Sequence, residues 1–354
     1  VRALAREAGL RLRLARIEAD IPHQEVLRAL ADGRIEQQGP AGELTPAAVC
    51  SCTHLVAQMG TGPIIRALEG GAQVVVAGRS CDTAIFAALP IAHGFDPALA
   101  LHAAKIAECG TLCAQPGGAN DCLLVTLRPE CFVVEPANPH RVCHPTSVAA
   151  HSLYEQPDPN CFYEPEGKVD LSACSFELAG ERAVRVTGAR LQPTRPAIKL
   201  EGAARRGFRA LTIAGARDPG VIAHLDEIEE ATRRAVAQNL AGALGGCDWS
   251  LRFLRYGLDA VTGHRVSAPP EEVGVVIEAI APDQELANAL VSLARSTALH
   301  QAFAGRKTTA GNFALPFSPS DLSAGPVYEF AVYHLMYTDD PDALFPVSFE
   351  EVGG

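Results

Sequence analysis

The chain has 354 residues and a formal net charge of −11, with 48% hydrophobic residues, and its sequence pI is about 5.5. This length predicts two α/β domains, each with its own core. The acidic balance, without a long Lys/Arg cluster, argues against nucleic acid as a partner. No apolar run approaches about 18 residues and no signal peptide opens the chain, so we expect a cytoplasmic protein without membrane contact, whose eleven cysteines are reduced.

Residues 1–135 are predicted to form an open, mostly parallel α/β (Rossmann-like) domain. A period-two pattern predicts a strand over 10–17, and a short β-branched run predicts a buried strand over 73–77. In such a sheet ligands bind beyond the carboxyl ends of the strands, where the loop 78–82 lies. Further strands are expected over 122–127 and 131–135, and helices over 2–8, 24–32, 63–69, 83–89 and 97–113.

Two further regions follow. Residues 136–205 are rich in proline and are predicted to be an irregular β-rich connection with short strands, notably over 183–190 and 196–200. Residues 206–354 predict a ferredoxin-like α+β domain, because their elements follow the order β-α-β-β-α-β. These elements are a strand over 209–214, a helix over 219–241, strands over 249–256 and 273–280, a helix over 283–303 and a strand over 327–337.

The first candidate site is the loop that leaves the buried strand at a helix N-terminus. Arg79 and Ser80 are predicted to hold a carboxylate or phosphate there, and Asp82 is a candidate general acid or base if it is partly desolvated. Simple capping of the helix explains Ser80 or Asp82 equally well. Cys81 is expected to have a lowered pKa at this helix end, but no Cys-His arrangement supplies the base that a thiol nucleophile needs.

The second candidate runs from Glu108 to Asp121. Gly117 and Gly118 would let the backbone approach a ligand closely, and Asn120 could donate a hydrogen bond to a developing oxyanion. The alternative is a helix C-cap followed by a turn, for which glycine and asparagine are common.

A third candidate is the loop 304–312, where Arg306 and Asn312 could close over a carboxylate or a coenzyme phosphate. The loop lacks the glycine-lysine-serine/threonine order of a nucleotide-binding loop, and a solvated crossing loop is the alternative. Lys199 stands between apolar neighbours and is either partly buried or extended to water. The scattered histidines, with His151 among the nearest to a ligand set, predict no metal site.

Several stretches together resemble the acyclic terpene utilisation family, bacterial proteins of branched isoprenoid acid catabolism. The resemblance spans roughly residues 1–350, although family members are longer at the N-terminus, so a missing opening segment is expected. The matching stretches are Gly71–Arg79 with Asp82, residues 108–120, Ser147–Glu155, Val186–Arg190, Lys199–Gly202, Gly311–Phe317, Asp339–Pro341 and Leu344–Pro346.

The resemblance implies a role in the catabolism of branched isoprenoid acids. Our leading hypothesis is an enzyme that acts as a lyase or hydratase on a branched, isoprenoid or hydroxylated carboxylic acid or its coenzyme A thioester. In this hypothesis Arg79, Lys199 and Arg306 bind anionic groups and Asp82 or Glu108 moves a proton. No cofactor is identified beyond coenzyme A as part of the substrate, and a homo-oligomer is expected. The alternatives are a non-catalytic subunit of a heteromeric catabolic complex and a hydrolase that uses Cys81.

Overall fold

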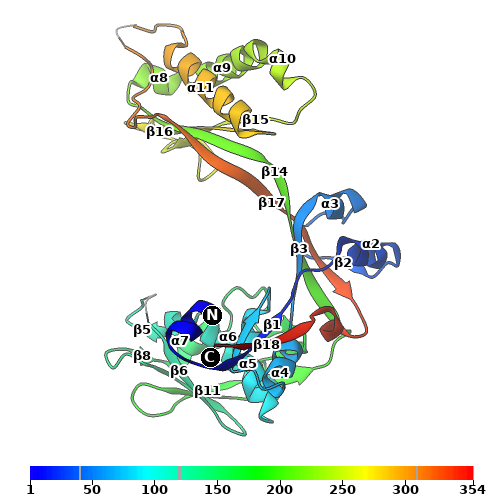
Figure 1. Ribbon diagram of the computed structural model, residues 1–354. Coiled ribbons are helices and arrows are strands. Elements are labelled where there is room, and N and C mark those ends of the chain that lie inside the picture. The colour runs from blue at the N-terminus through cyan, green and yellow to red at the C-terminus, as the bar shows by residue number, and fades with distance from the viewer. Residues whose placement is uncertain (40, 119–120, 308–309, 354) are drawn as a thin grey trace. The chain divides into compact units, whose positions relative to one another are not determined.

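The computed structural model describes residues 1–39, 41–118, 121–307 and 310–353, and the chain divides into two compact units. Unit 1 comprises Val1–Gly202 and Phe330–Gly354, and unit 2 comprises Ala203–Glu329. Strands β14 (Ala197–Ala216) and β17 (Asp321–Tyr337) each contribute residues to both units (Figure 1).

Two helices of unit 1 begin at residues whose side chains cap them. The Asp96 side chain accepts a hydrogen bond from the Leu99 amide, and the Thr45 side chain accepts one from the Ala48 amide. No helix in the described ranges is long and apolar enough to cross a lipid bilayer. The helices are α1 (Arg2–Glu7), α2 (His23–Ala31), α3 (Pro46–Ser51), α4 (Thr61–Glu69), α5 (Asp82–Ala92), α6 (Pro97–Glu108) and α7 (Pro145–His151), with 3-10 turns η1 (Gly110–Cys113) and η2 (Pro341–Leu344).

Most strands of unit 1 form small sheets, with the orders β18-β1-β4, β13-β10-β9, β11-β12-β7-β6 and β5-β8, whereas β2 pairs with β17 and β3 pairs with β14. The strands are β1 (Leu12–Ile17), β2 (Ile35–Gln37), β3 (Cys52–Gln58), β4 (Val74–Ala77), β5 (Ala114–Gln115), β6 (Leu123–Leu127), β7 (Phe132–Pro136), β8 (Val142–Cys143), β9 (Cys161–Glu164), β10 (Gly167–Asp170), β11 (Ser175–Leu178), β12 (Val184–Thr187), β13 (Arg190–Gln192) and β18 (Val347–Val352).

The prediction of a mostly parallel sheet in the N-terminal part is wrong, because the sheets are mostly antiparallel. Strands β1 and β4 pair in parallel as expected, but the other neighbour of β1 is β18, which comes from the end of the chain and runs antiparallel. The remaining small sheets are built from antiparallel neighbours such as β9 and β10. Local periodicity reveals a strand but not its distant partner, so the sequence pattern could not show these pairings.

Strand β3, which the sequence pattern did not predict, brings two helix N-termini together. The main chain of Met59, just after β3, forms a parallel bridge with Ser80, just after β4. The Met59 amide donates to the Arg79 carbonyl at 3.2 Å, and the Cys81 amide donates to the Met59 carbonyl at 2.9 Å. Helices α4 and α5 therefore begin from neighbouring strand ends.

The hairpin of β9 and β10 packs beside these helices. Phe162 on β9 and Val169 on β10 belong to one buried cluster with Ala87 of α5 and with Leu101 and Ala104 of α6. Burial of the apolar side of the hairpin fixes its turn, residues 165–166, near the N-termini of α4 and α5.

Unit 2 contains the later part of β14, helices α8 (Pro219–Ala223), α9 (Leu225–Asn239) and α10 (Ala241–Leu244), strands β15 (Ser250–Tyr256) and β16 (Val273–Ala281), helix α11 (Gln284–His300) and the first part of β17. Its strands follow the order β15-β16-β14-β17, and α9 and α11 pack together (Figure 1). The single helix expected over 219–241 is interrupted at His224, whose ring nitrogen Nδ1 contacts the Gly220 carbonyl at 2.7 Å. A ferredoxin-like arrangement of this unit stays a prediction.

Gly78, where the chain leaves β4, allows a close approach that a larger residue would prevent. A Cβ atom there would lie 2.7 Å from Ala19 Cβ and 3.0 Å from the Ala19 main-chain nitrogen, which cannot swing aside as a flexible side chain can. We therefore expect Gly78→Ala to lower the free energy of unfolding by about 1–3 kcal/mol in urea denaturation. The matched control is Gly42→Ala, because a Cβ there meets no described atom within 4 Å. Equal stability of the two variants would contradict this prediction.

Candidate functional site

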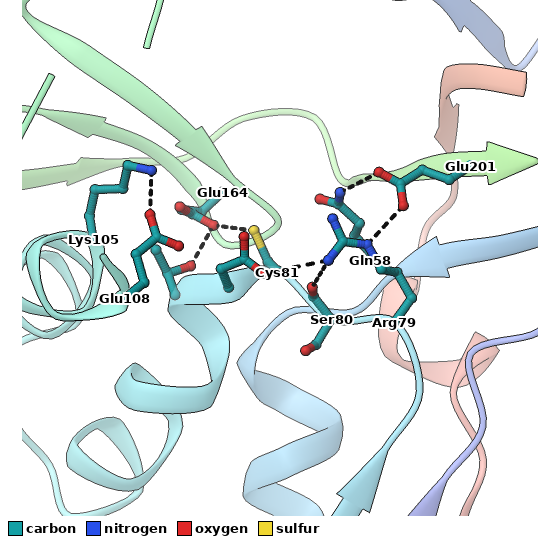
Figure 2. A network of polar contacts seen from close by, with 10 residues as sticks. Gln58, Arg79, Ser80, Cys81, Lys105, Glu108, Glu164 and Glu201 are labelled. Atoms are coloured by element: carbon teal, nitrogen blue, oxygen red, sulfur yellow. Dashed lines mark hydrogen bonds and ion pairs between the residues drawn. The ribbon is translucent and has the colours of Figure 1, made fainter. Parts of the chain in front are cut away.

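Two carboxylates from the β9–β10 hairpin lie at the N-termini of α4 and α5. Oε2 of Glu164 accepts hydrogen bonds from Cys81 Sγ at 2.7 Å and from Thr83 Oγ1 at 2.8 Å (Figure 2). Oε1 of Glu166 accepts from the Thr61 amide and, at 2.7 Å, from Thr61 Oγ1. Helix N-termini stabilise negative charge, so the hairpin itself supplies the anions that the sequence pattern led us to expect from a ligand.

The close approach of the hairpin turn depends on Gly60, the N-cap of α4. A Cβ atom on Gly60 would lie 2.6 Å from Glu166 Oε1 and 2.9 Å from Pro165 Cβ. The second carboxylate oxygen of Glu166, Oε2, is buried and has no hydrogen-bond partner among the described residues. A buried carboxylate that is only half satisfied raises the electrostatic cost of every other negative charge nearby.

Burial raises the pKa of Glu164 to about 7, and the negative charge of Glu166 acts in the same direction. The hydrogen bonds from Cys81 and Thr83 lower this pKa, and so does the positive charge of Lys105. A carboxyl group with a pKa near 7 is present in both protonation states at neutral pH. This property suits a group that accepts and returns a proton during a reaction.

The prediction of a lowered pKa for Cys81 is wrong. Burial raises the pKa of this thiol, and both the charge of Glu164 and the hydrogen bond to it act in the same direction. Burial and donation to a carboxylate both favour the neutral thiol over the thiolate. Cys81 therefore positions Glu164, and the thiolate that a cysteine hydrolase needs is disfavoured.

Arg79 is oriented by a carboxylate from β14. Its Nε donates to Glu201 Oε2 at 2.8 Å, while Gln58 donates to the other oxygen of Glu201 at 2.7 Å (Figure 2). Its Nη1 donates to the Ser80 carbonyl at 3.2 Å and contacts Asp82 Oδ1 at 3.4 Å. The side chain is 38% exposed, and no described residue accepts a hydrogen bond from Nη2. Arg79 can therefore present one amino group to an anionic ligand.

Asp82 and Ser80 lie beside Arg79 as the sequence pattern predicts, but in different environments. The Asp82 side chain is 64% exposed, so it does not have the partial burial that the prediction supposed. Ser80 is buried and contributes its main chain to the bridge with Met59 and its carbonyl to Arg79. Glu164, which the sequence pattern did not single out, has the environment that was expected for Asp82.

Glu108 is also near this group, through an ion pair with Lys105. The two side chains, both on α6, are 9% and 7% exposed. Burial raises the pKa of Glu108, whereas the hydrogen bond and charge of Lys105 lower it. The charge of Asp82 also raises the pKa of Glu108, and the charge of Lys105 lowers the pKa of Glu164 as well, so Lys105 acts on both glutamates.

The glycines of the second candidate lie in an exposed loop that is fixed by a buried arginine. Gly117 and Gly118 are exposed, and a Cβ atom on either would meet no described atom within 4 Å. Arg141 donates to carbonyl groups along this loop and to Asp121 Oδ2 at 3.1 Å. Asn120 lies outside the described residues. The loop thus has a local anchor in Arg141, a residue that the sequence pattern did not reveal.

The remaining predicted binding residues have local contacts. Lys199 lies on β14 with its Nζ 5.3 Å from the centre of the Tyr333 ring. Arg306 and Asn312 belong to unit 2, where Arg306 Nε donates to Asn312 Oδ1 at 2.8 Å. The Asn312 amide group donates to the carbonyls of Ala298 and Gln301 at the end of α11, so Asn312 closes that helix. Within the described residues, no group of three or more His, Cys, Asp or Glu could hold a metal ion.

Sequence reasoning missed Glu164, Lys105 and Gln58 as parts of this site. For Glu164 a weak signal was present, since short alternating segments flank Pro165 and Gly167 and are typical of a hairpin. Glu201 stood within one of the stretches that carried the family resemblance. Nothing local indicated that these residues would meet the loop 78–82.

Comparison with family models finds a match to the one described as "Acyclic terpene utilisation family protein AtuA", over residues 1–120 and 125–319. The family that the sequence motifs predict is therefore confirmed, although the motifs at 339–346 lie beyond the matched residues. No curated protein and no solved structure matches the chain.

The pKa of Glu164 predicts a pH-dependent cost in stability. The pKa of Glu164 is about 7 in the folded protein and 4.5 for an ordinary glutamate. Between these two pH values the unfolded chain binds fewer protons than the folded chain, so the free energy of unfolding falls as the pH rises from 4.5 to 7. Glu164→Gln keeps an oxygen for Cys81 and Thr83 but cannot ionise. We expect this variant to gain roughly 2–3 kcal/mol relative to the natural protein on going from pH 5 to pH 8.

Urea denaturation at several pH values measures this difference. Since other raised carboxyl groups, such as Glu108 and Glu229, are present in both proteins, their contribution cancels in the comparison. A constant difference between the two proteins across this range would show that Glu164 ionises normally.

Proposed function

Because the chain belongs to the acyclic terpene utilisation family, which implies a role in acyclic terpene utilisation, we propose that it is a lyase or hydratase of a branched carboxylic acid or its coenzyme A thioester. The observation that supports this reaction class is the Glu164 carboxyl group, whose pKa is about 7. It lies in the same network of polar contacts as the Arg79 side chain, which is 38% exposed (Figure 2). A proton-transfer group beside a fixed cation is what chemistry next to a carboxyl or thioester carbonyl requires.

In the proposed reaction, the Glu164 carboxylate removes a proton from the carbon next to the carbonyl group. The electron pair of the broken C–H bond moves to the carbonyl oxygen, where the Arg79 guanidinium stabilises the negative charge. In a dehydration, the electron pair then returns to form a carbon–carbon double bond while a hydroxyl group leaves from the next carbon with a proton. In a lyase reaction run toward cleavage, the Glu164 carboxylate instead takes the proton of a hydroxyl group on the next carbon. The electron pair of that O–H bond forms a carbonyl group, the carbon–carbon bond breaks with its electron pair moving into the enolate, and protonated Glu164 then gives its proton to the enolate carbon.

The neighbouring residues have positioning roles in this proposal. Cys81 and Thr83 hold Oε2 of Glu164 in place through two donors on one oxygen. Glu201 fixes the Arg79 side chain, and its own second oxygen is held by Gln58. A group held in this way loses little conformational entropy when a ligand binds, which favours a productive geometry.

Exchange of the substrate proton with solvent tests this proposal without knowledge of the complete reaction. The purified protein is incubated in D₂O with 3-methylbutanoyl-CoA, and loss of the proton next to the carbonyl is followed by NMR. We expect exchange with the natural protein and a rate lower by a factor of about 100 or more with Glu164→Gln. Arg79→Gln should weaken binding of the thioester roughly 10- to 100-fold, because it removes a charged hydrogen bond.

The matched control is Arg28→Gln, since Arg28 is 67% exposed on α2. This variant should bind and exchange as the natural protein does. Exchange that persists in Glu164→Gln would remove Glu164 from the reaction. Unaltered binding by Arg79→Gln would remove Arg79 from the ligand site.

A further inference from the structure

His151, the last residue of α7, has an unpaired nitrogen in a buried position. The residue is 7% exposed, and its Nε2 has no hydrogen-bond partner among the described residues. Its ring stacks on Tyr154, with the ring centres 5.4 Å apart and the planes at 20°. Most buried polar atoms have a partner, so an unpaired imidazole nitrogen points to a group that is supplied from outside the chain.

The surroundings of His151 are polar and connect it to the candidate site. Burial lowers the pKa of His151, the positive charge of Lys105 lowers it further, and a hydrogen bond with the Ile106 main chain acts in the opposite direction. The same ammonium group of Lys105 pairs with Glu108 and lowers the pKa of Glu164. Lys105 is therefore electrostatically coupled to both Glu164 and His151.

A strained backbone position adds a second observation. Glu155 has a φ of 59°, in the left-handed region that residues other than glycine seldom adopt. It directly follows Tyr154, whose hydroxyl pKa is raised first by Glu155 and also by Cys109, which follows Glu108 in the chain. Strained non-glycine residues concentrate at binding and catalytic sites, where the surrounding structure holds them in place.

The charges near His151 select the kind of group that it can bind. The positive charge of Lys105 is already balanced by Glu108, and the carboxylates of Asp82 and Glu155 both act on Glu108 as like charges. Because Lys105 is already paired with Glu108, it offers no free cation to a second anion, so a negatively charged ligand group is not favoured at His151. A neutral hydroxyl group fits, because it can donate to the bare nitrogen or accept from its N–H and so satisfies Nε2 in either tautomer.

We propose that His151 binds the hydroxyl group of a hydroxylated branched acid whose carboxyl or thioester end lies at Arg79. This inference rests on the proposed function and deepens it, since it names a hydroxy acid as the substrate class. In this arrangement the anionic or polarised end of the ligand meets the free amino group of Arg79, the hydroxyl meets Nε2 of His151, and Glu164 faces the carbon between them. His151 then selects for the hydroxylated ligand.

Binding of a matched ligand pair tests this selection. Calorimetry compares 3-hydroxy-3-methylbutanoyl-CoA with 3-methylbutanoyl-CoA, which differ only in the hydroxyl group. We expect the natural protein to favour the hydroxylated thioester about tenfold, as one hydrogen bond to a buried group allows. His151→Phe keeps a ring to stack on Tyr154 but has no nitrogen, so it should lose this preference and bind the other thioester as before. The control His93→Phe, at an exposed histidine, should keep the preference.

A measurement on the natural protein covers the case in which His151→Phe does not fold. With ¹⁵N-labelled histidine, the Nε2 resonance of His151 should shift when the hydroxylated thioester is added and not when its counterpart is added. If both thioesters bind equally and their binding depends on Arg79, this inference is wrong and the proposed function stands. If neither thioester binds, both this inference and the proposed function are wrong. A variant His151→Phe that weakens both ligands equally would also overturn the selection by His151.

Discussion

The candidate site depends on the placement of two carboxylates of one hairpin at the N-termini of two helices. Glu164 is largely withdrawn from water, the Oε2 atom of Glu166 is buried as well, and the charge of Glu166 raises the cost of ionising Glu164. The main-chain and hydroxyl donors at the start of α4, and the thiol and hydroxyl donors at the start of α5, offset this cost. The balance leaves Glu164 with a pKa of about 7, a value that neither the helix end nor burial would give alone.

The same hairpin explains which part of the site the sequence could predict. The loop 78–82 was identifiable because a strand, a short polar loop and a helix follow one another, and this pattern is local. Its partners are not local, since Glu164 is 83 residues beyond Cys81 and Glu201 is 122 residues beyond Arg79. The antiparallel pairing of β1 with β18 has the same origin. Such contacts are set by burial of apolar faces, and periodicity alone does not specify which faces meet.

Environment, not residue type, separates the carboxylates of this site. Asp82 stood at the expected helix start, yet its side chain is largely exposed and holds Arg79 only weakly, at 3.4 Å. Glu164 comes from a segment that the sequence pattern did not single out, and it is desolvated by burial. The error over Cys81 has the same cause, because the expected effect of the helix end on the thiol is outweighed by burial and by a carboxylate acceptor. Sequence spacing gives positions along the chain but not the solvation on which a pKa depends.

The distribution of charge gives the site two unlike ends. At one end, the Arg79 guanidinium is oriented by a carboxylate but has one amino group that can bind a ligand. Near His151, the charges of Lys105 and Glu108 cancel, and burial together with the charge of Lys105 favours the neutral imidazole. A ligand with a single anionic group would satisfy only the first end. A ligand that carries an anion or thioester at one end and a hydroxyl at the other would satisfy both, with Glu164 acting on the carbon between. The buried, unpaired Nε2 of His151 raises the free energy of the free protein. A ligand hydroxyl that pairs with this nitrogen removes that penalty, which favours binding of the hydroxylated acid over the acid without the hydroxyl group.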